Sequence, residues 1–371
     1  MLLLLLIAFI FLVYAALMLY YYRGWQRIPR FSIPADIVFD KTVSVLIPVR
    51  NEAANITRLL QCLQQQSYPR HLVQIILIND NSTDNTRALA EAFADVDIID
   101  LDSSVTHSHK KKAIEAGIKI ARGEWIVTTD GDCYMDKNWL SNIIAFQQNT
   151  NASYIAAPVV IDAGTSLVQR FQQMDFAVLQ GVTGVSVNER LHAMSNGANQ
   201  AYSKAIFHEV GGYSGVDHTA SGDDLFLLQK INQHLPQSVA YLCSKDAIVS
   251  TAAVNTWREF FQQRIRWASK AKYYKEGKIW MVMLSVYLLN LSFPLLLFAG
   301  IFNYNYLLAA LVLWISKTII EWPFVNRVFR FFGLPFSFIG FFLFQPLHML
   351  YTVISGFLGF VRRYEWKGRV G

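Results

Sequence analysis

The stretch GEWIVTTDGDCYMDKNWL, residues 123–140, places two carboxylates at the end of an apolar strand. We expect a strand over 125–129 that runs directly into Asp130, Gly131 and Asp132. Alternate side chains of an extended chain point to the same side, and glycine lets the backbone bend, so both carboxylates can face one cation. Such oxygen ligands suit Mg²⁺ or Mn²⁺, and two neighbouring carboxylates are costly without a cation. A turn with acidic residues is the alternative, because Asp and Gly are common turn residues.

Composition divides the chain into a charged middle and apolar ends. Of its 371 residues 53% are hydrophobic, too many for an ordinary soluble enzyme, whereas the middle is too charged for a membrane bundle. We therefore expect one α/β domain with membrane segments on both sides. The three cysteines, Cys62, Cys133 and Cys243, have neither a zinc-site spacing nor a disulfide framework, which favours reduced thiols in a cytosolic domain.

The first apolar run, residues 2–22, is long enough to span a bilayer as a helix. A signal peptide would carry basic residues before such a run, but here Arg23, Arg27 and Arg30 follow it, and the tyrosines at 20–22 are typical of an interfacial aromatic belt. We expect an uncleaved anchor with its amino terminus outside, then a linker at 23–41. The net charge of +6 gathers beside the apolar runs, which indicates a membrane surface, and no helix-turn-helix or finger pattern supports nucleic-acid binding.

The region after the linker alternates apolar strands with helices. Strands are expected at 43–49, 74–80, 96–100 and 125–129, and helices at 53–66, 84–94 and 110–121. This order predicts a parallel sheet with helices on both faces, where ligands bind beyond the carboxyl ends of the strands. Glu52, Asp80 and the Asp130/Asp132 pair all follow strand ends, and their convergence on one edge favours a ligand site over a simple turn.

The second part of the domain, which we expect to cover 42–253 in all, has weaker signals. Strands are expected near 154–161 and 192–203. A helix over 221–233 begins with Asp223 and Asp224, and acids at a helix start can be capping residues. For one of the two, capping is the simpler role.

The region 254–278 is an amphipathic helix with aromatic residues on one side and basic residues on the other, as in helices that lie in a bilayer interface. That interpretation does not explain the sequence QRIRW at 263–267.

Three apolar spans follow, at about 279–301, 304–322 and 334–361. If the last crosses once, the basic tail 362–371 falls outside, so we favour a re-entrant hairpin broken at Pro346, which returns the tail to the cytosol. Lys317 and Glu321, four residues apart, either pair and reach the cytosolic end of their span or form a lipid headgroup site.

Taken together, the motifs resemble the membrane-bound family 2 glycosyltransferases, in particular the ceramide glucosyltransferase-like and carotenoid-acid glycosyltransferase-like members. The resemblance covers nearly the whole chain. Its marks are VSVLIPVRNE (43–52), NDNSTDNT (79–86), the triplet at 130–132, the acidic pair at 223–224 and QRIRW (263–267). It implies a GT-A-type, Rossmann-like domain that binds a nucleotide-sugar, together with Mg²⁺ or Mn²⁺.

The resemblance also implies roles for single residues in donor binding. Pro48, Arg50 and Glu52 match the family's first nucleotide-binding loop, and Asp80 matches the carboxylate that contacts the uracil or ribose. The segment HKKKAIE (109–115) resembles the family's G-K-x-x-A-L-N, with His109 in place of glycine and Glu115 in place of asparagine. Lys110 is the expected diphosphate contact, with Lys111 and Lys112 as alternatives.

The remaining motifs imply the metal, the base and the acceptor end of the site. Asp130 and Asp132 match the D-x-D metal motif, with Asp132 as the direct ligand and Asp130 also beside the donor. Aligning DDLFL onto the family's E-D-x-x-L makes Asp224 the catalytic base, with Asp223 replacing the glutamate. Gln263, Arg266 and Trp267 match Q-x-x-R-W at the acceptor and diphosphate end, and Arg264 lies within that motif.

The sequence therefore predicts an inverting, metal-dependent hexosyltransferase that moves a sugar from a UDP-sugar to a membrane lipid. We expect it in a bacterial-type inner membrane, with the catalytic domain in the cytoplasm. A processive polysaccharide synthase shares Q-x-x-R-W and is one alternative, although the carboxy-terminal spans are few for a polymer channel. A non-catalytic membrane protein that only binds nucleotide-sugars is the other.

Overall fold

A computed structural model of the chain describes residues 1–102, 109–192, 194–216, 222–274 and 277–361, and the backbone of 365–366 and 369–370. Most of the expected basic tail 362–371 lies outside these residues. The chain divides into two compact units. The sheet unit comprises Ile28–Asp162 and Ser186–Ala252, and the helical unit comprises Met1–Arg27, Ala163–Val185 and Ala253–Gly371.

The sheet unit is built on a seven-stranded sheet in the order β3-β2-β1-β4-β8-β6-β9. The strands β1 (Val43–Val49), β2 (Val73–Asn79), β3 (Val96–Asp100) and β4 (Trp125–Thr128) are parallel, as the alternation of strands and helices predicts. β8 (Gln200–Ser203) runs antiparallel to both β4 and β6 (Tyr154–Ala156), and β6 is parallel to β9 (Val239–Tyr241). The sheet is therefore mixed, with the expected parallel part at one side.

A second sheet of three strands has the order β5-β10-β7, with β5 (Cys133–Met135), β10 (Val249–Ala252) and β7 (Val159–Asp162). The single strand expected at 154–161 is wrong, because β6 and β7 belong to different sheets. Pro158 lies between them and has no N–H to continue a ladder. The strand expected at 192–203 is reduced to β8, since residues 195–199 contain the turn-forming pair Asn196-Gly197.

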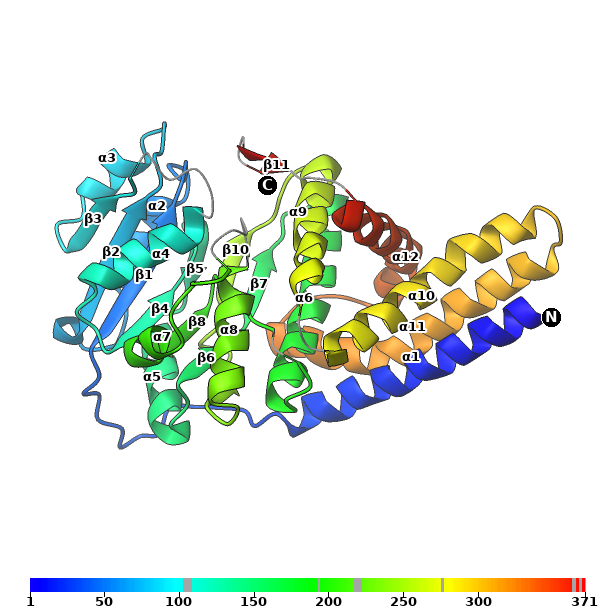
Figure 1. The fold of residues 1–371 in the computed structure, drawn as a ribbon, viewed down its shortest axis with the longest axis horizontal. Coiled ribbons are helices and arrows are strands. Elements are labelled where there is room, and N and C mark those ends of the chain that lie inside the picture. The colour runs from blue at the N-terminus through cyan, green and yellow to red at the C-terminus, as the bar shows by residue number, and fades with distance from the viewer. Residues whose placement is uncertain are drawn as a thin grey trace. The chain divides into compact units, whose positions relative to one another are not determined.

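The helices of the sheet unit are short. They are α2 (Ile56–Gln64), the 3₁₀ turn η1 (Arg70–Leu72), α3 (Thr86–Glu91), α4 (His109–Ile120), α5 (Trp139–Thr150), α7 (Lys204–Glu209) and α8 (Asp223–His234). α4 lies against β1 and β2 (Figure 1). A Cβ on Gly117 of α4 would lie 3.1 Å from side-chain atoms of Leu46 and Ile78, so this glycine allows the helix to approach the sheet closely.

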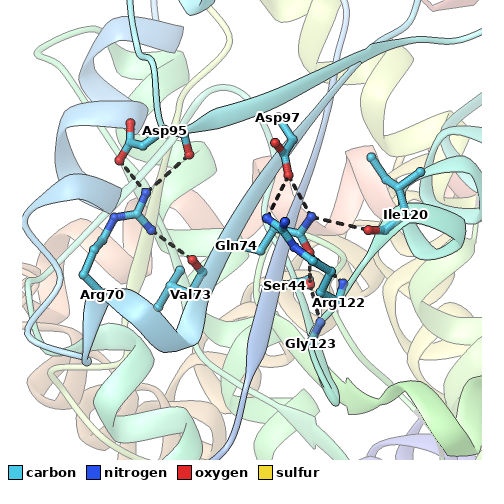
Figure 2. A network of polar contacts seen from close by, with 9 residues as sticks. All are labelled: Ser44, Arg70, Val73, Gln74, Asp95, Asp97, Ile120, Arg122 and Gly123. Atoms are coloured by element: carbon cyan, nitrogen blue, oxygen red, sulfur yellow. Dashed lines mark hydrogen bonds and ion pairs between the residues drawn. The ribbon is translucent and has the colours of Figure 1, made fainter.

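A polar network ties the amino-terminal ends of these strands together (Figure 2). The side-chain oxygen of Gln74 accepts from the Ser44 hydroxyl at 2.8 Å and from the Arg122 amide at 2.7 Å. Its amide nitrogen donates to Asp97 at 2.7 Å, and the Ser44 hydroxyl accepts from the Gly123 amide at 2.9 Å. The buried hydroxyl and amide are thereby satisfied, as burial requires.

Among the described residues of the helical unit, four helices are long and apolar enough to cross a membrane. These are α1 (Leu2–Arg27), α10 (Gly277–Gly300), α11 (Asn305–Phe332) and α12 (Phe338–Val361). They overlap the predicted apolar segments, but α11 continues ten residues beyond the expected end at 322 and α12 begins four residues after the expected start at 334. Tyr21 and Trp25 of α1 are buried against Phe324 of α11. Tyr21 is thus a packing residue within the unit instead of part of an interfacial belt.

The hairpin expected at Pro346 is wrong, because α12 continues through this residue. Proline removes the hydrogen bond to the carbonyl four residues earlier, which is that of Phe342. The indole of Trp314 in α11 donates to this carbonyl at 2.9 Å, and its ring stacks on Phe342 at 4.4 Å. A neighbouring helix therefore satisfies the group that proline frees, which is how proline is tolerated in apolar helices.

The remaining elements of the helical unit are α6 (Leu167–Asn188), whose first part lies in this unit, α9 (Trp257–Ser269) and the 3₁₀ turn η2 (Lys270–Tyr273). A capping box between Thr256 and Glu259 starts α9. The helix expected to continue to 278 is wrong in its end, because α9 ends at Ser269 and η2 follows it directly.

The domain expected over 42–253 is not one unit in the structure, because its residues Ala163–Val185 belong to the helical unit. Within that unit α6 packs closely on α11, because a Cβ on Gly181 would lie 2.5 Å from a methyl group of Val328 and 2.9 Å from the ring of Phe324.

Lys317 and Glu321 form an ion pair of 2.6 Å inside the helical unit. The lysine is fully buried, and it also donates to Gln345 of α12 at 2.7 Å. Glu321 in turn accepts from Gln345 and from the Tyr14 hydroxyl of α1. The expected pairing is confirmed, but the lysine does not extend to the end of its span. The pair instead joins three helices.

Candidate functional site

The acidic residues after β1, β2 and β4 lie at one edge of the sheet, since β1 pairs in parallel with both other strands. The amide of Asp80 donates to the Val49 carbonyl at 2.8 Å, and the guanidinium of Arg50 donates to the Asp80 carbonyl at 3.0 Å. A ring nitrogen of His109 lies 3.1 Å from a carboxylate oxygen of Asp80. Backbone and side chain of Asp80 are thus both held in place.

The loop after β1 is held by the loop after β2. The amide of Glu52 donates to the Thr86 hydroxyl at 2.7 Å, and its carboxylate accepts from Asn55 at 2.9 Å. Pro48 lies in β1 opposite Ile78. The expected first nucleotide-binding loop therefore has a defined conformation.

Gly131 is required by close packing. A Cβ on this residue would lie 2.8 Å from Glu52 Cγ and 2.9 Å from Val49 Cγ1. It is not among the residues with positive φ, so the absent side chain, more than backbone freedom, explains the glycine. The Asp130–Asp132 turn consequently lies directly against the loop after β1.

Lys110 joins the D-x-D turn to the acidic pair at the start of α8. Its amino group is 2.6 Å from Asp130 Oδ1 and 3.4 Å from Asp223 Oδ2. Burial lowers the pKa of Lys110, but the carboxylates of Asp130, Asp223 and Asp224 outweigh it and raise that pKa well above its usual range. This lysine is therefore a permanent cation between two acidic motifs that lie far apart in the sequence.

The other two lysines of the HKKK segment point elsewhere. The amino group of Lys111 is buried and donates to the Val216 carbonyl at 2.6 Å, above the ring of Phe226. Lys112 pairs with Glu115 at 3.0 Å. Of the three, Lys110 is the one that the structure brings to the acidic centre.

Neither acid of the pair is the N-cap residue of α8, which is Gly222; both lie in the first turn of the helix. Both carboxylates are buried, with Asp223 6% and Asp224 9% exposed. Asp224 accepts from the Leu225 amide at 2.7 Å and from the Gly197 amide at 3.2 Å. These two donors fix the orientation of its carboxylate.

Asp132 is held from the second sheet. β10 pairs with β5 so that Thr251 lies opposite Cys133, and the Thr251 hydroxyl donates to Asp132 Oδ2 at 3.1 Å. Burial, with Asp132 and Asp130 close by, raises the pKa of the Cys133 thiol well above its usual value, so it stays protonated. Its thiol donates weakly to Asp132 Oδ1 at 3.7 Å.

The D-x-D turn fits a divalent cation shared with a phosphorylated ligand. The described residues contain no group of three or more His, Cys, Asp or Glu side chains that could hold a metal. Mg²⁺, however, is usually bound by one or two carboxylates together with substrate phosphate oxygens. Asp130 and Asp132 supply that number of carboxylates, and Lys110 shows that a cation is stable beside Asp130.

Gly197 also belongs to this centre, although the sequence did not identify it as a site residue. A Cβ on Gly197 would lie 2.8 Å from both Asp223 Oδ2 and Lys110 Nζ. Its carbonyl accepts from the Thr128 hydroxyl at 2.9 Å, which ties it to the end of β4. The Asn196-Gly197 dipeptide is a turn signal that could have located this loop.

The QRIRW residues lie on α9 of the helical unit. Arg264 is buried, and its guanidinium pairs with Asp175 of α6 at 2.8 Å. It also donates to the Gln263 side chain at 3.0 Å and lies 4.2 Å from the ring centre of Trp267. Trp267 packs on Phe176 at 5.7 Å.

Known proteins are similar to this chain in both sequence and fold. Residues 44–215 match the model of the family "Glycosyl transferase family 2". The probable glycosyltransferase YdaM of Bacillus subtilis is 25% identical over 238 residues, which cover 62% of this chain and 55% of that protein. A poly-beta-1,6-N-acetyl-D-glucosamine synthase of Staphylococcus epidermidis is 23% identical over 238 residues, 61% of this chain and 53% of the synthase.

The chain thus spans about half the length of these two relatives. Among solved structures, the mannosyltransferase PcManGT of Pyrobaculum calidifontis, in complex with GDP-Man and Mn²⁺, superposes with a TM-score of 0.58. The match covers 96% of this chain and 99% of that one at 17% identity, and so shows a shared fold. The finer ceramide or carotenoid subfamily receives no support from these matches. The chain carries a glycosyl transferase family 2 domain on a GT-A-like fold.

Proposed function

We propose that this protein is an inverting, metal-dependent glycosyltransferase that moves a sugar from a UDP-sugar to a membrane lipid. The observation that carries the proposal is the acidic centre, where Lys110 lies between Asp130 and Asp223 and Asp224 is held by two amides. Its place beyond the carboxyl ends of parallel strands is where nucleotide ligands bind in such sheets.

On the donor side, Asp80 contacts the uracil or ribose, and Pro48, Arg50 and Glu52 line the nucleotide loop. Lys110 approaches the diphosphate, because it is the lysine of its segment that reaches the D-x-D turn. Asp130 and Asp132 hold Mg²⁺ or Mn²⁺, which, when bound, neutralises part of the diphosphate charge. PcManGT, which shares the fold, was solved with a nucleotide-sugar and Mn²⁺.

On the acceptor side, Asp224 takes the proton of the acceptor hydroxyl. The acceptor oxygen forms a bond to the anomeric carbon while the bond from that carbon to the diphosphate breaks, and the nucleoside diphosphate leaves. A single displacement of this kind inverts the anomeric configuration. Asp223 keeps Lys110 in place, and Gln263, Arg266 and Trp267 of α9 line the acceptor and diphosphate end.

Four apolar helices support a membrane location and hence a lipid acceptor. We place the protein in a bacterial-type inner membrane with the sheet unit in the cytoplasm.

The test uses the full-length protein in lipid nanodiscs, total lipid extract as acceptor, Mg²⁺ or Mn²⁺, and a panel of labelled UDP- and GDP-sugars. We expect label to enter the organic phase from one UDP-sugar, and Asp224→Asn to abolish this. Asp95→Asn, a carboxylate paired with Arg70 at the surface, is the matched control and should keep full activity. Transfer from a GDP-sugar alone would refute the UDP assignment.

A processive polysaccharide synthase is the second candidate, favoured by the similarity to the Staphylococcus epidermidis synthase. In the same assay it predicts label in a long polymer instead of a lipid-soluble product. A protein that only binds nucleotide-sugars predicts UDP binding without turnover, with loss of function in Asp80→Asn but not in Asp224→Asn.

A further inference from the structure

Arg264 is the buried charged residue of QRIRW, and it faces the interior of its unit together with Ile265. Its side chain is 5% exposed. The guanidinium Nε donates to Asp175 Oδ2 at 3.1 Å, Nη2 forms an ion pair with the same oxygen at 2.8 Å, and Nη1 donates to Gln263 Oε1 at 3.0 Å. Its faces lie 4.2 Å from the ring centre of Trp267 and 4.7 Å from that of Phe260. The guanidinium is thus held by two hydrogen bonds, an ion pair and two aromatic rings.

Asp175 is itself anchored on both sides. One carboxylate oxygen binds Arg264, and the other accepts from the Tyr351 hydroxyl and lies 3.7 Å from His348 Nε2. Tyr351 and His348 belong to α12, so the carboxylate of α6 connects α9 with α12. The two helices also meet closely, since a Cβ on Gly359 would lie 2.7 Å from that of Ala268.

We infer that Asp175 and Arg264 are a positioning pair that fixes the side chains of Gln263 and Trp267, and that Arg264 does not itself bind diphosphate or acceptor. The chain of contacts runs from α12 through Asp175 to the guanidinium, and from the guanidinium to a hydrogen bond with Gln263 and a cation–π contact with Trp267. A buried charge pair often adds little net stability. We therefore assign to this pair the role of fixing the positions of the side chains around it.

The catalytic part of this inference rests on the proposed function, but the geometric part does not. The planar guanidinium is essential to it, because a lysine keeps the charge beside Asp175 yet cannot bond Gln263 and stack on Trp267 at once. Arg264→Lys is therefore the variant that preserves folding while removing the positioning. Arg258→Lys, at an exposed site on the same helix, is the matched control.

The first readout is the ¹⁹F spectrum of the full chain labelled with 5-fluorotryptophan in nanodiscs, with the Trp267 signal assigned by Trp267→Phe. We expect this signal to shift or broaden in Arg264→Lys and Asp175→Asn and to stay unchanged in Arg258→Lys. An unchanged Trp267 signal in both variants of the pair would overturn the inference, whether or not any sugar transfer is observed.

The second readout is kinetic. A misplacement of about 1 Å can lower the rate about 100-fold, so we expect kcat in Arg264→Lys to fall by about tenfold to 100-fold while the nucleotide Kd changes by less than about twofold. A nucleotide Kd raised about tenfold or more would show that Arg264 binds the diphosphate. If no donor is turned over by the native protein, the proposed function fails and the ¹⁹F result still decides the geometry.

Discussion

Replacing Gly197 by alanine tests whether the centre formed by Lys110, Asp223 and Asp224 is the reacting centre. The new methyl group would lie 2.8 Å from both Asp223 Oδ2 and Lys110 Nζ, whereas ordinary contacts begin at 3.4 Å. Each group must therefore move by about 0.6 Å. Gly197 is not among the positive-φ residues, so alanine introduces no backbone strain and the effect is that of the methyl group alone.

The magnitude follows from this displacement. Overpacking costs about 1–3 kcal/mol, and we expect the lower end because the displaced atoms are side-chain ends. If a shift of 1 Å costs about 100-fold in rate, a shift of this size costs about tenfold or more in kcat, or about 1.4 kcal/mol of barrier.

The assay compares sugar transfer and thermal unfolding of Gly197→Ala with those of Gly277→Ala, where nothing lies within 4 Å of the new methyl group. The control should keep native kcat and unfolding temperature. If Gly197→Ala keeps native kcat while its unfolding temperature falls slightly, the acidic centre does not perform the reaction and the assignment of Asp224 is refuted.

Three further changes test the fold. Burial lowers the pKa of His192 to about 4, so between pH 6.5 and 4 the imidazole is protonated in the unfolded chain but not in the folded protein. The free energy of unfolding therefore falls by about 3 kcal/mol as the pH is lowered through this window. His192→Gln should flatten the pH dependence of the unfolding temperature, and an unchanged profile would contradict this. Gln74→Met leaves the Ser44 hydroxyl and Arg122 amide without their acceptor and should cost about 1–3 kcal/mol, whereas Gln64→Met, at a surface contact, should cost little. Lys317→Met leaves Glu321 without its cation and should destabilise the protein in detergent by about 3–5 kcal/mol; the double change with Glu321→Met should recover most of the loss, and additive losses would show that the pair is not coupled.

Local sequence was sufficient for the parallel part of the sheet. The strands expected at 43–49 and 96–100 have those bounds in the structure. The first is buried and almost continuously apolar, as in the interior of a parallel sheet, and the second is an edge strand whose valine and isoleucines favour an extended chain. The short strands β5, β9 and β10 and the helix α6 lacked such a pattern and were not predicted. Their residues are ordered by partners distant in the sequence.

The acidic residues at the edge of the sheet could also be predicted from the sequence. Parallel strands end at one edge, so polar residues directly after them must meet there. The sequence could not show which of Lys110, Lys111 and Lys112 reaches the acidic residues. Three consecutive residues of a helix point in different directions, and the packing of α4 decides which of them faces the site.

The composition and order of residues account for the four apolar helices among the described residues, the parallel part of the sheet and a row of acids at its edge. These depend on periodicity and on interactions between near neighbours. The tertiary structure alone decided that Arg264 faces Asp175, that Lys110 joins Asp130 to Asp223, and that α12 continues through Pro346. In each case a buried polar group finds its partner on another element far away in the chain, and burial makes that partner obligatory without revealing where in the sequence it lies.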